Sequence, residues 1–112
     1  MENIINDPTY TVQDGTIYSL TVIIGNGQLG SSALKNFDGE YIHGAVNNVI
    51  LGDGKNIRGK NLLITSMVTD ANSNTNTTVI SYKLNGDTIG PYSKDVDTDN
   101  SSISYTTTIH FT

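Results

Sequence analysis

Five dipeptides that join Asn or Asp to Gly divide this chain of 112 residues into short segments. They are Asp14-Gly15, Asn26-Gly27, Asp38-Gly39, Asp53-Gly54 and Asn85-Gly86, and the first four follow one another at intervals of 12 to 15 residues. Glycine adopts a positive φ without strain and Asn or Asp tolerates it, as tight turns between antiparallel strands require. The remaining long gap holds a polar run, residues 71–76, that predicts another hairpin loop.

Between these turns, apolar and polar residues alternate with the period of two that is typical of β-strands. Residues 102–111 are the clearest case, because Ile, Tyr, Thr and Phe alternate there with Ser, Thr and His. Threonine, isoleucine, valine and tyrosine, which favour strands, are plentiful. Further strands are expected at 16–24, 62–68 and 79–84, with weaker ones at 9–12, 31–37, 40–43, 46–51 and 89–94.

These features predict an all-β chain, folded as an antiparallel two-sheet β-sandwich of immunoglobulin-like type with about seven to nine short strands. A small β-barrel is the alternative. The chain lacks the Cys pair and the Trp of immunoglobulin domains, so the likeness is one of architecture. Its length and the absence of a linker predict a single domain over residues 1–112. Residues 1–7 are expected to be a flexible N-terminal segment or a strand donated to a partner.

The charge balance excludes two classes of partner. Eleven Asp and Glu residues against six Lys and Arg give a net charge of −5. Proteins that follow nucleic-acid phosphates or lie on anionic membranes need the opposite balance. No run of about 18 apolar residues and no signal-peptide pattern is present, so we expect no membrane insertion. The chain is expected to be cytoplasmic or exported without a leader.

The segment Gly25-Asn26-Gly27-Gln28-Leu29-Gly30 matches the dinucleotide-binding pattern G-x-G-x-x-G. In that motif the glycines allow pyrophosphate to approach the N-terminus of a following helix. Residues 31–37 are too few for such a helix before Asp38-Gly39 ends the segment. The sequence therefore predicts a glycine-rich bend between strands rather than a nucleotide site.

Alternating Asp residues in the segment Asp95–Asp99 resemble the beginning of a calcium loop. The remaining pattern differs, because the sixth position is Asn100 rather than Gly and the twelfth is Thr106 rather than Glu. We interpret the segment as a solvated acidic loop. A looser calcium site completed by a distant carboxylate, such as Asp53 or Asp87, is the alternative.

Catalytic groups are few. His43 and His110 are the only histidines, cysteine is absent, and no G-x-S-x-G nucleophile motif occurs. Two isolated histidines do not make a structural zinc site. The sequence therefore predicts no enzyme, no catalytic, cofactor-binding or metal-binding residues, and no cofactor.

Two other groups of residues are candidates for binding. Lys55, Arg58 and Lys60 form a short basic stretch that would attract an acidic partner, although a solvated loop is the simpler interpretation. Three tyrosines are expected on core faces: Tyr18, Tyr82 and Tyr105. Three others are expected near strand ends or loops, where they would stack on sugars or anchor an interface: Tyr10, Tyr41 and Tyr92.

Three functions follow as hypotheses. The leading one is a non-enzymatic β-sandwich module that acts by binding another protein chain or by self-association. The alternative is a carbohydrate- or calcium-binding, lectin-like module, for which Asn, Asp and Tyr side chains in loops are suitable. The third is a small effector or toxin exported without an N-terminal leader.

Overall fold

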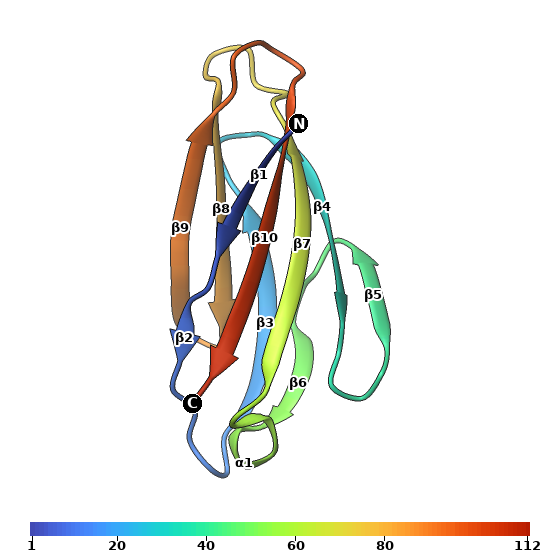
Figure 1. Cartoon of the computed structure of the whole chain (residues 1–112), viewed down its shortest axis with the longest axis vertical. Coiled ribbons are helices and arrows are strands. Elements are labelled where there is room, and N and C mark those ends of the chain that lie inside the picture. Colours follow the sequence, from blue (N-terminus) through green and yellow to red (C-terminus); the bar gives the residue numbers. More distant parts are fainter.

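The alternation of apolar and polar residues becomes an alternation of buried and exposed side chains. Along Ser102–Phe111 (β10), every second residue from Ile103 is buried, and Asn61–Thr69 (β7) shows the same pattern. The computed structural model describes all 112 residues and confirms the two-sheet β-sandwich (Figure 1). Because the two sheets share no strand pairing, the barrel alternative is wrong.

Six strands form sheet A and four form sheet B. Sheet A has the order β1 (Glu2–Asn6), β10, β7, β4 (Leu29–Lys35) and β5 (Tyr41–Gly44), with β2 (Thr9–Tyr10) beside the end of β10. Sheet B has the order β6 (Val49–Asp53), β3 (Ile17–Ile24), β8 (Thr77–Leu84) and β9 (Asp87–Asp95).

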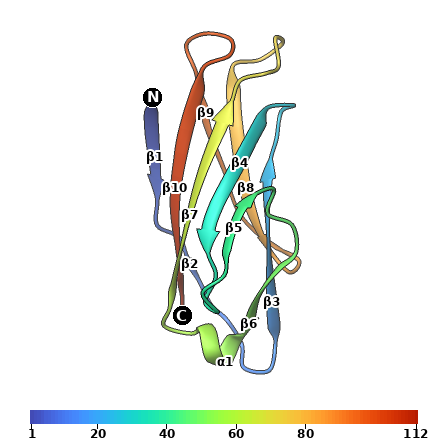
Figure 2. The ribbon, with the colours of Figure 1, turned by 90° about the vertical axis from the view of Figure 1, so that its right-hand side faces the viewer.

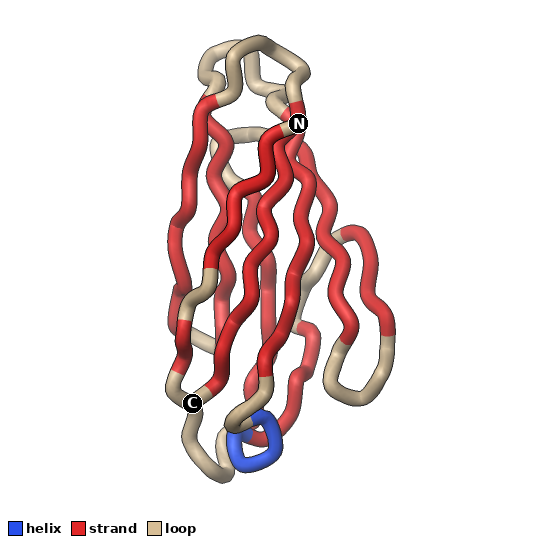
Figure 3. The backbone as a smooth tube through the Cα atoms, in the orientation of Figure 1, coloured by secondary structure: helices blue, strands red, loops and turns tan.

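All strand pairs are antiparallel except those of β1 and β2, which run parallel to β10. The ten strands exceed the predicted range by one, because residues 2–6 form β1, a strand that the alternation did not predict. A four-residue helix, α1 (Gly54–Ile57), joins β6 to β7 and is the only helix (Figure 3).

The predicted turns occur where expected, but they connect different kinds of elements. Asp38-Gly39 and Asn85-Gly86 close the hairpins β4–β5 and β8–β9. Asn26-Gly27 instead leads from sheet B to sheet A, as does Asp14-Gly15 in the reverse direction. Asp53-Gly54 begins α1. Residues 71–76 also cross between the sheets, so the prediction of a hairpin there was wrong.

The core contains two reciprocal hydrogen bonds between the sheets. The Tyr82 hydroxyl of sheet B pairs with Thr107 Oγ1 of sheet A at 2.7 Å, and the Tyr105 hydroxyl of sheet A pairs with Thr78 Oγ1 of sheet B at 2.7 Å. All four residues are buried, as is Tyr18. The prediction of three core tyrosines is therefore confirmed, and each inter-sheet pair satisfies polar groups that burial would otherwise leave costly.

Burial raises the pKa of Tyr82 to about 12. An unfolded chain releases this proton near pH 10, so between pH 10 and 12 the unfolded state binds fewer protons than the folded state. The stabilisation that the raised pKa of Tyr82 contributes is therefore fully present below pH 10. Above pH 10 the free energy of unfolding falls, by up to about 1.4 kcal/mol per pH unit from this one group. Urea unfolding between pH 8 and 11.5 should show a shallower fall in Tyr82→Phe. Equal slopes in the two proteins would contradict this assignment.

Candidate functional site

The first four residues of the motif Gly25–Gly30 form the bend between β3 and β4, and its last two begin β4, so the prediction of a bend between strands is confirmed. Its Gln28 is 7% exposed, and its side chain forms four hydrogen bonds with the backbone of residues 71–77. We call this set of hydrogen bonds the Gln28 clamp. Oε1 of Gln28 accepts the N–H groups of residues 71 and 72 at 2.7 and 3.0 Å. Nε2 donates to the carbonyls of Thr75 and Thr77 at 3.4 and 3.1 Å. No local pattern in the sequence indicates this role of Gln28.

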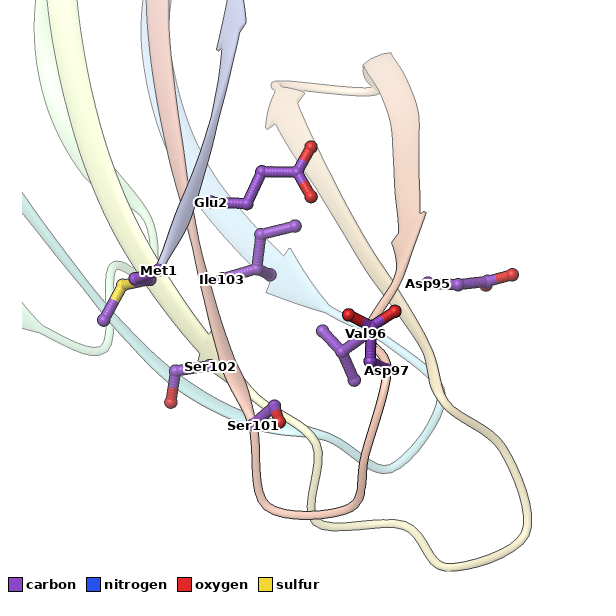
Figure 4. A pocket seen from close by; sticks show the side chains of 8 residues that line it. All are labelled: Met1, Glu2, Asp95, Val96, Asp97, Ser101, Ser102 and Ile103. Carbon is purple, nitrogen blue, oxygen red and sulfur yellow. The ribbon is translucent and has the colours of Figure 1, made fainter.

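The alternating Asp residues of the acidic loop do not converge. Asp95 accepts a hydrogen bond from Thr77 Oγ1 at 2.6 Å, and it lines a pocket of about 260 Å³ together with Asp97 and Glu2 (Figure 4). No group of three or more Asp, Glu, His or Cys residues is close enough to hold a metal ion, and the three carboxylates of this pocket stand apart. Asp99 lines a different hollow.

The two distant carboxylates considered for this loop lie at the opposite end of the sandwich. Asp53 caps α1 and accepts the N–H groups of Lys55 and Gly15, each at 2.9 Å, and these bonds hold the pKa of its carboxyl below its usual value. Asp87 accepts a hydrogen bond from the Tyr10 hydroxyl at 2.6 Å. Neither residue joins the acidic loop.

The two histidines lie on the outside of sheet A. His110 Nδ1 is 2.8 Å from Asn61 Oδ1, and its Nε2 is 3.4 Å from Asp7 Oδ1. His43 is exposed on β5 and lies opposite Ala33 of β4. Neither imidazole forms a hydrogen bond with a serine hydroxyl.

The basic stretch is largely engaged within the chain. Arg58 forms an ion pair with Asp14 and donates to the carbonyl of Val12 at 3.0 Å. Lys60 Nζ lies 5.4 Å from the centre of the Phe37 ring. Two of the three basic side chains therefore hold the α1 region in place, and only Lys55 is without such a contact.

The loop tyrosines also separate into different classes. Tyr10 and Tyr92 are half-buried and pack against the core, whereas Tyr41 is 76% exposed. The Tyr41 ring lies beside Lys35, whose Nζ is 5.4 Å from its centre. Only Tyr41 is therefore free to anchor a binding partner in the way that the sequence suggested.

The outer face of sheet A is the surface on which exposed apolar side chains gather. We use this name for the outward side chains of β1, β4, β5, β7 and β10. Five of the nine large exposed apolar residues lie on it: Ile5, Leu29, Tyr41, Leu63 and Met67. The strands β4, β5, β7 and β10 contain no Asp or Glu, although the chain as a whole is acidic.

Two hollows mark this face. One has a volume of about 370 Å³ and lies over β4, β5 and β7, where Lys35, Tyr41, Asn61 and Leu63 line it together with Thr65. The other holds about 180 Å³ and is lined by further small, polar and apolar side chains, including Ser31, Ala33, His43, Met67 and Ser104. The face therefore offers apolar contacts with hydroxyl groups between them.

The strand edges are less suited to binding than this face. Edge strand β5 has four residues, and edge strands β1 and β6 have five each. Strand β9 carries Pro91, which has no N–H to donate, and its pairing with β8 shifts in register. Short or interrupted edges of this kind hinder the addition of a further strand.

Comparisons with protein-family models, with curated proteins and with solved structures gave no match. Nothing helical in the fold has the length and hydropathy of a membrane span.

Proposed function

We propose that this chain is a non-enzymatic β-sandwich module that self-associates, and that two copies meet through the outer face of sheet A. The observation that carries the proposal is the coincidence of exposed apolar side chains with strands that have no carboxylate. Contiguous exposed apolar surface is typical of interaction sites. The immunoglobulin-like type of the sandwich stays a prediction.

Charge supports a second copy as the occupant. Each chain carries −5, so the repulsion between two copies is smallest where the surfaces that meet carry few carboxylates. The hydroxyls of Thr65 and Ser104 also suit a second copy, because a hydroxyl both donates and accepts. A face of this kind can pair with a copy of itself across a two-fold axis.

Sedimentation velocity over a range of concentrations tests this proposal. The unaltered chain should sediment as a dimer at high concentration, and Leu63→Glu with Met67→Glu should make it monomeric at every concentration. The matched control is Ile17→Glu with Ile23→Glu on sheet B. The exposed fractions are similar, at 53% and 47% for the first pair and 54% and 41% for the second. A monomeric unaltered chain, or dissociation by both pairs alike, would contradict the proposal.

A second candidate function is carbohydrate binding in the larger hollow. It is favoured by Tyr41, an exposed aromatic ring beside Lys35 and Asn61, which supply hydrogen-bond donors for sugar hydroxyls. Binding of this kind predicts a change in the tyrosine fluorescence of the unaltered chain on titration with a sugar panel, and its loss in Tyr41→Ala. Self-association and sugar binding are distinguished because only the first depends on protein concentration.

A further inference from the structure

Two loops meet at the end of the sandwich opposite α1 (Figures 1 and 2). They are residues 70–76 between β7 and β8, and residues 96–101 between β9 and β10. The N–H of Asp70 donates to the carbonyl of Ser101, and the carbonyl of Asp70 accepts the N–H of Asn100, both at 2.9 Å. These backbone bonds fix the two loops to each other.

One oxygen of the Asp70 carboxylate is buried without a hydrogen-bond partner. The residue is 1% exposed, and its Oδ1 is buried and has no hydrogen-bond partner. The ion pairs of the structure are Arg58–Asp14, Lys94–Glu2 and His110–Asp7, so no cationic side chain neutralises Asp70. A buried carboxylate without a partner is costly, and a bound cation is one way to remove that cost.

Asp70 also lines a hollow of about 120 Å³, and so does Asp99 from the other loop. The side-chain amide of Asn76 lies between the two carboxylates, with one end 2.8 Å from Asp70 Oδ2 and 2.9 Å from Asp99 Oδ1. With its nitrogen turned inward, the amide donates to both carboxylates. With its oxygen turned inward, the amide nitrogen faces only donors, and three side-chain oxygens converge that only a bound cation would hold together.

We propose that Asp70, Asn76 and Asp99 supply the side-chain oxygens of a calcium site. Neighbouring equatorial ligands about 2.4 Å from a Ca²⁺ ion in pentagonal-bipyramidal geometry are about 2.8 Å apart, so this cluster accepts the ion without moving, although ordinary hydrogen bonds have the same spacing. The buried Asp70 carboxylate, with one unpartnered oxygen, supplies charge, and the hollow leaves room for water ligands. Of the alternating Asp residues, only Asp99 belongs to this site. Calcium affinity rises with the number of carboxylate ligands, and this site has only two. We therefore expect a dissociation constant of about 0.1 to 1 mM, as in weakly binding extracellular modules.

Thermal unfolding with about 10 mM CaCl₂ and with a chelator tests the site. This calcium concentration is about 10 to 100 times the expected dissociation constant, so it should raise the midpoint of a domain of this size by about 5 to 20 °C. Magnesium should raise it less, because Mg²⁺ demands octahedral geometry and gives up its water reluctantly. The measurement is made at a low protein concentration, so it is independent of self-association.

Variants locate the ion. Asp99→Asn should weaken calcium binding at least tenfold, whereas Asp97→Asn, the same charge change in the same loop, should leave the calcium shift intact. Asp70→Asn should unfold at or above the temperature of the unaltered chain in chelator and below it in calcium. If Asp70→Asn does not fold, the comparison of the other two variants decides.

Three results would overturn the proposal. The first is an equal midpoint of the unaltered chain in calcium and in chelator, which is the outcome expected if the Asn76 nitrogen bridges the two carboxylates. The second is a full calcium shift in Asp99→Asn. The third is loss of the calcium shift in Asp97→Asn, which would place the ion in the pocket lined by Glu2, Asp95 and Asp97.

Discussion

Replacing Gly54 with alanine is expected to lower the free energy of unfolding by about 3 kcal/mol, at the upper end of what overpacking a core usually costs. A Cβ atom at Gly54 would lie 2.1 Å from the carbonyl oxygen of Gln13 and 2.8 Å from its carbonyl carbon. Both are backbone atoms, so no rotation of a side chain relieves the contact. The turn that carries Gln13 would have to move away from α1.

That movement would break other contacts at this end of the sandwich. The N–H of Gly54 donates to the carbonyl of Thr16 at 2.9 Å, and the N–H of Gln13 donates to the buried Tyr18 hydroxyl at 2.9 Å. Displacing the turn would lengthen both bonds. The cost of Gly54→Ala is therefore expected to include hydrogen bonding as well as overlap of atoms.

Gly86→Ala is the matched control, because a Cβ there meets no atom within 4 Å and the residue has no positive φ. Its free energy of unfolding should stay within about 1 kcal/mol of that of the unaltered chain. Urea unfolding followed by circular dichroism measures both variants. Equal stabilities of Gly54→Ala and Gly86→Ala would show that the turn yields at little cost.

The fold was predictable because two local signals agree. Alternation located β3, β7, β8 and β10 within a residue or two, and the Asn-Gly and Asp-Gly pairs located the turns. Which turns join strands of one sheet and which cross between sheets depends on tertiary packing, so the dipeptides did not distinguish them. Strand β1 was missed because its pairing with β10 joins the two ends of the chain, and Ile4 and Ile5 are adjacent rather than alternating with polar residues.

The candidate sites were less predictable, since contacts between distant loops define them. The run from Asp95 to Asp99 marked an acidic loop, but nothing local pairs Asp99 with Asp70 and Asn76 rather than with its own neighbours. The alternation along β7 already pointed to the outer face of sheet A. Leu63 and Met67 occupy positions in this strand whose side chains point away from the core, where polar residues are expected. Such residues, apolar where the pattern expects polar ones, are the signal that the sequence offers for a binding face.

Gln28 is the second position at which a large effect is expected. Gln28→Ala should lower the free energy of unfolding by about 2 to 4 kcal/mol, because the N–H groups of residues 71 and 72 lose their acceptor and the carbonyls of Thr75 and Thr77 lose a donor. These hydrogen bonds are only partly buried, so the loss of each costs less than the about 1 to 3 kcal/mol of a fully buried group left without a partner. Gln13→Ala is the control, since the other glutamine of the chain is exposed and its side chain forms no hydrogen bond.

Gln28→Glu separates the two halves of the clamp. A carboxylate accepts the N–H groups of residues 71 and 72 as Oε1 does, but it donates nothing to Thr75 and Thr77, and its oxygen would face their carbonyls. At low pH the introduced acid is protonated and donates a hydrogen bond. The free energy of unfolding of Gln28→Glu is therefore expected to lie between those of Gln28→Ala and the unaltered chain. At neutral pH the free energy of unfolding of Gln28→Glu should fall toward the value for Gln28→Ala. Urea unfolding at pH 4 and pH 7 measures the difference, and equal effects of Gln28→Ala and Gln13→Ala would show that the loop between β7 and β8 holds its shape without the clamp.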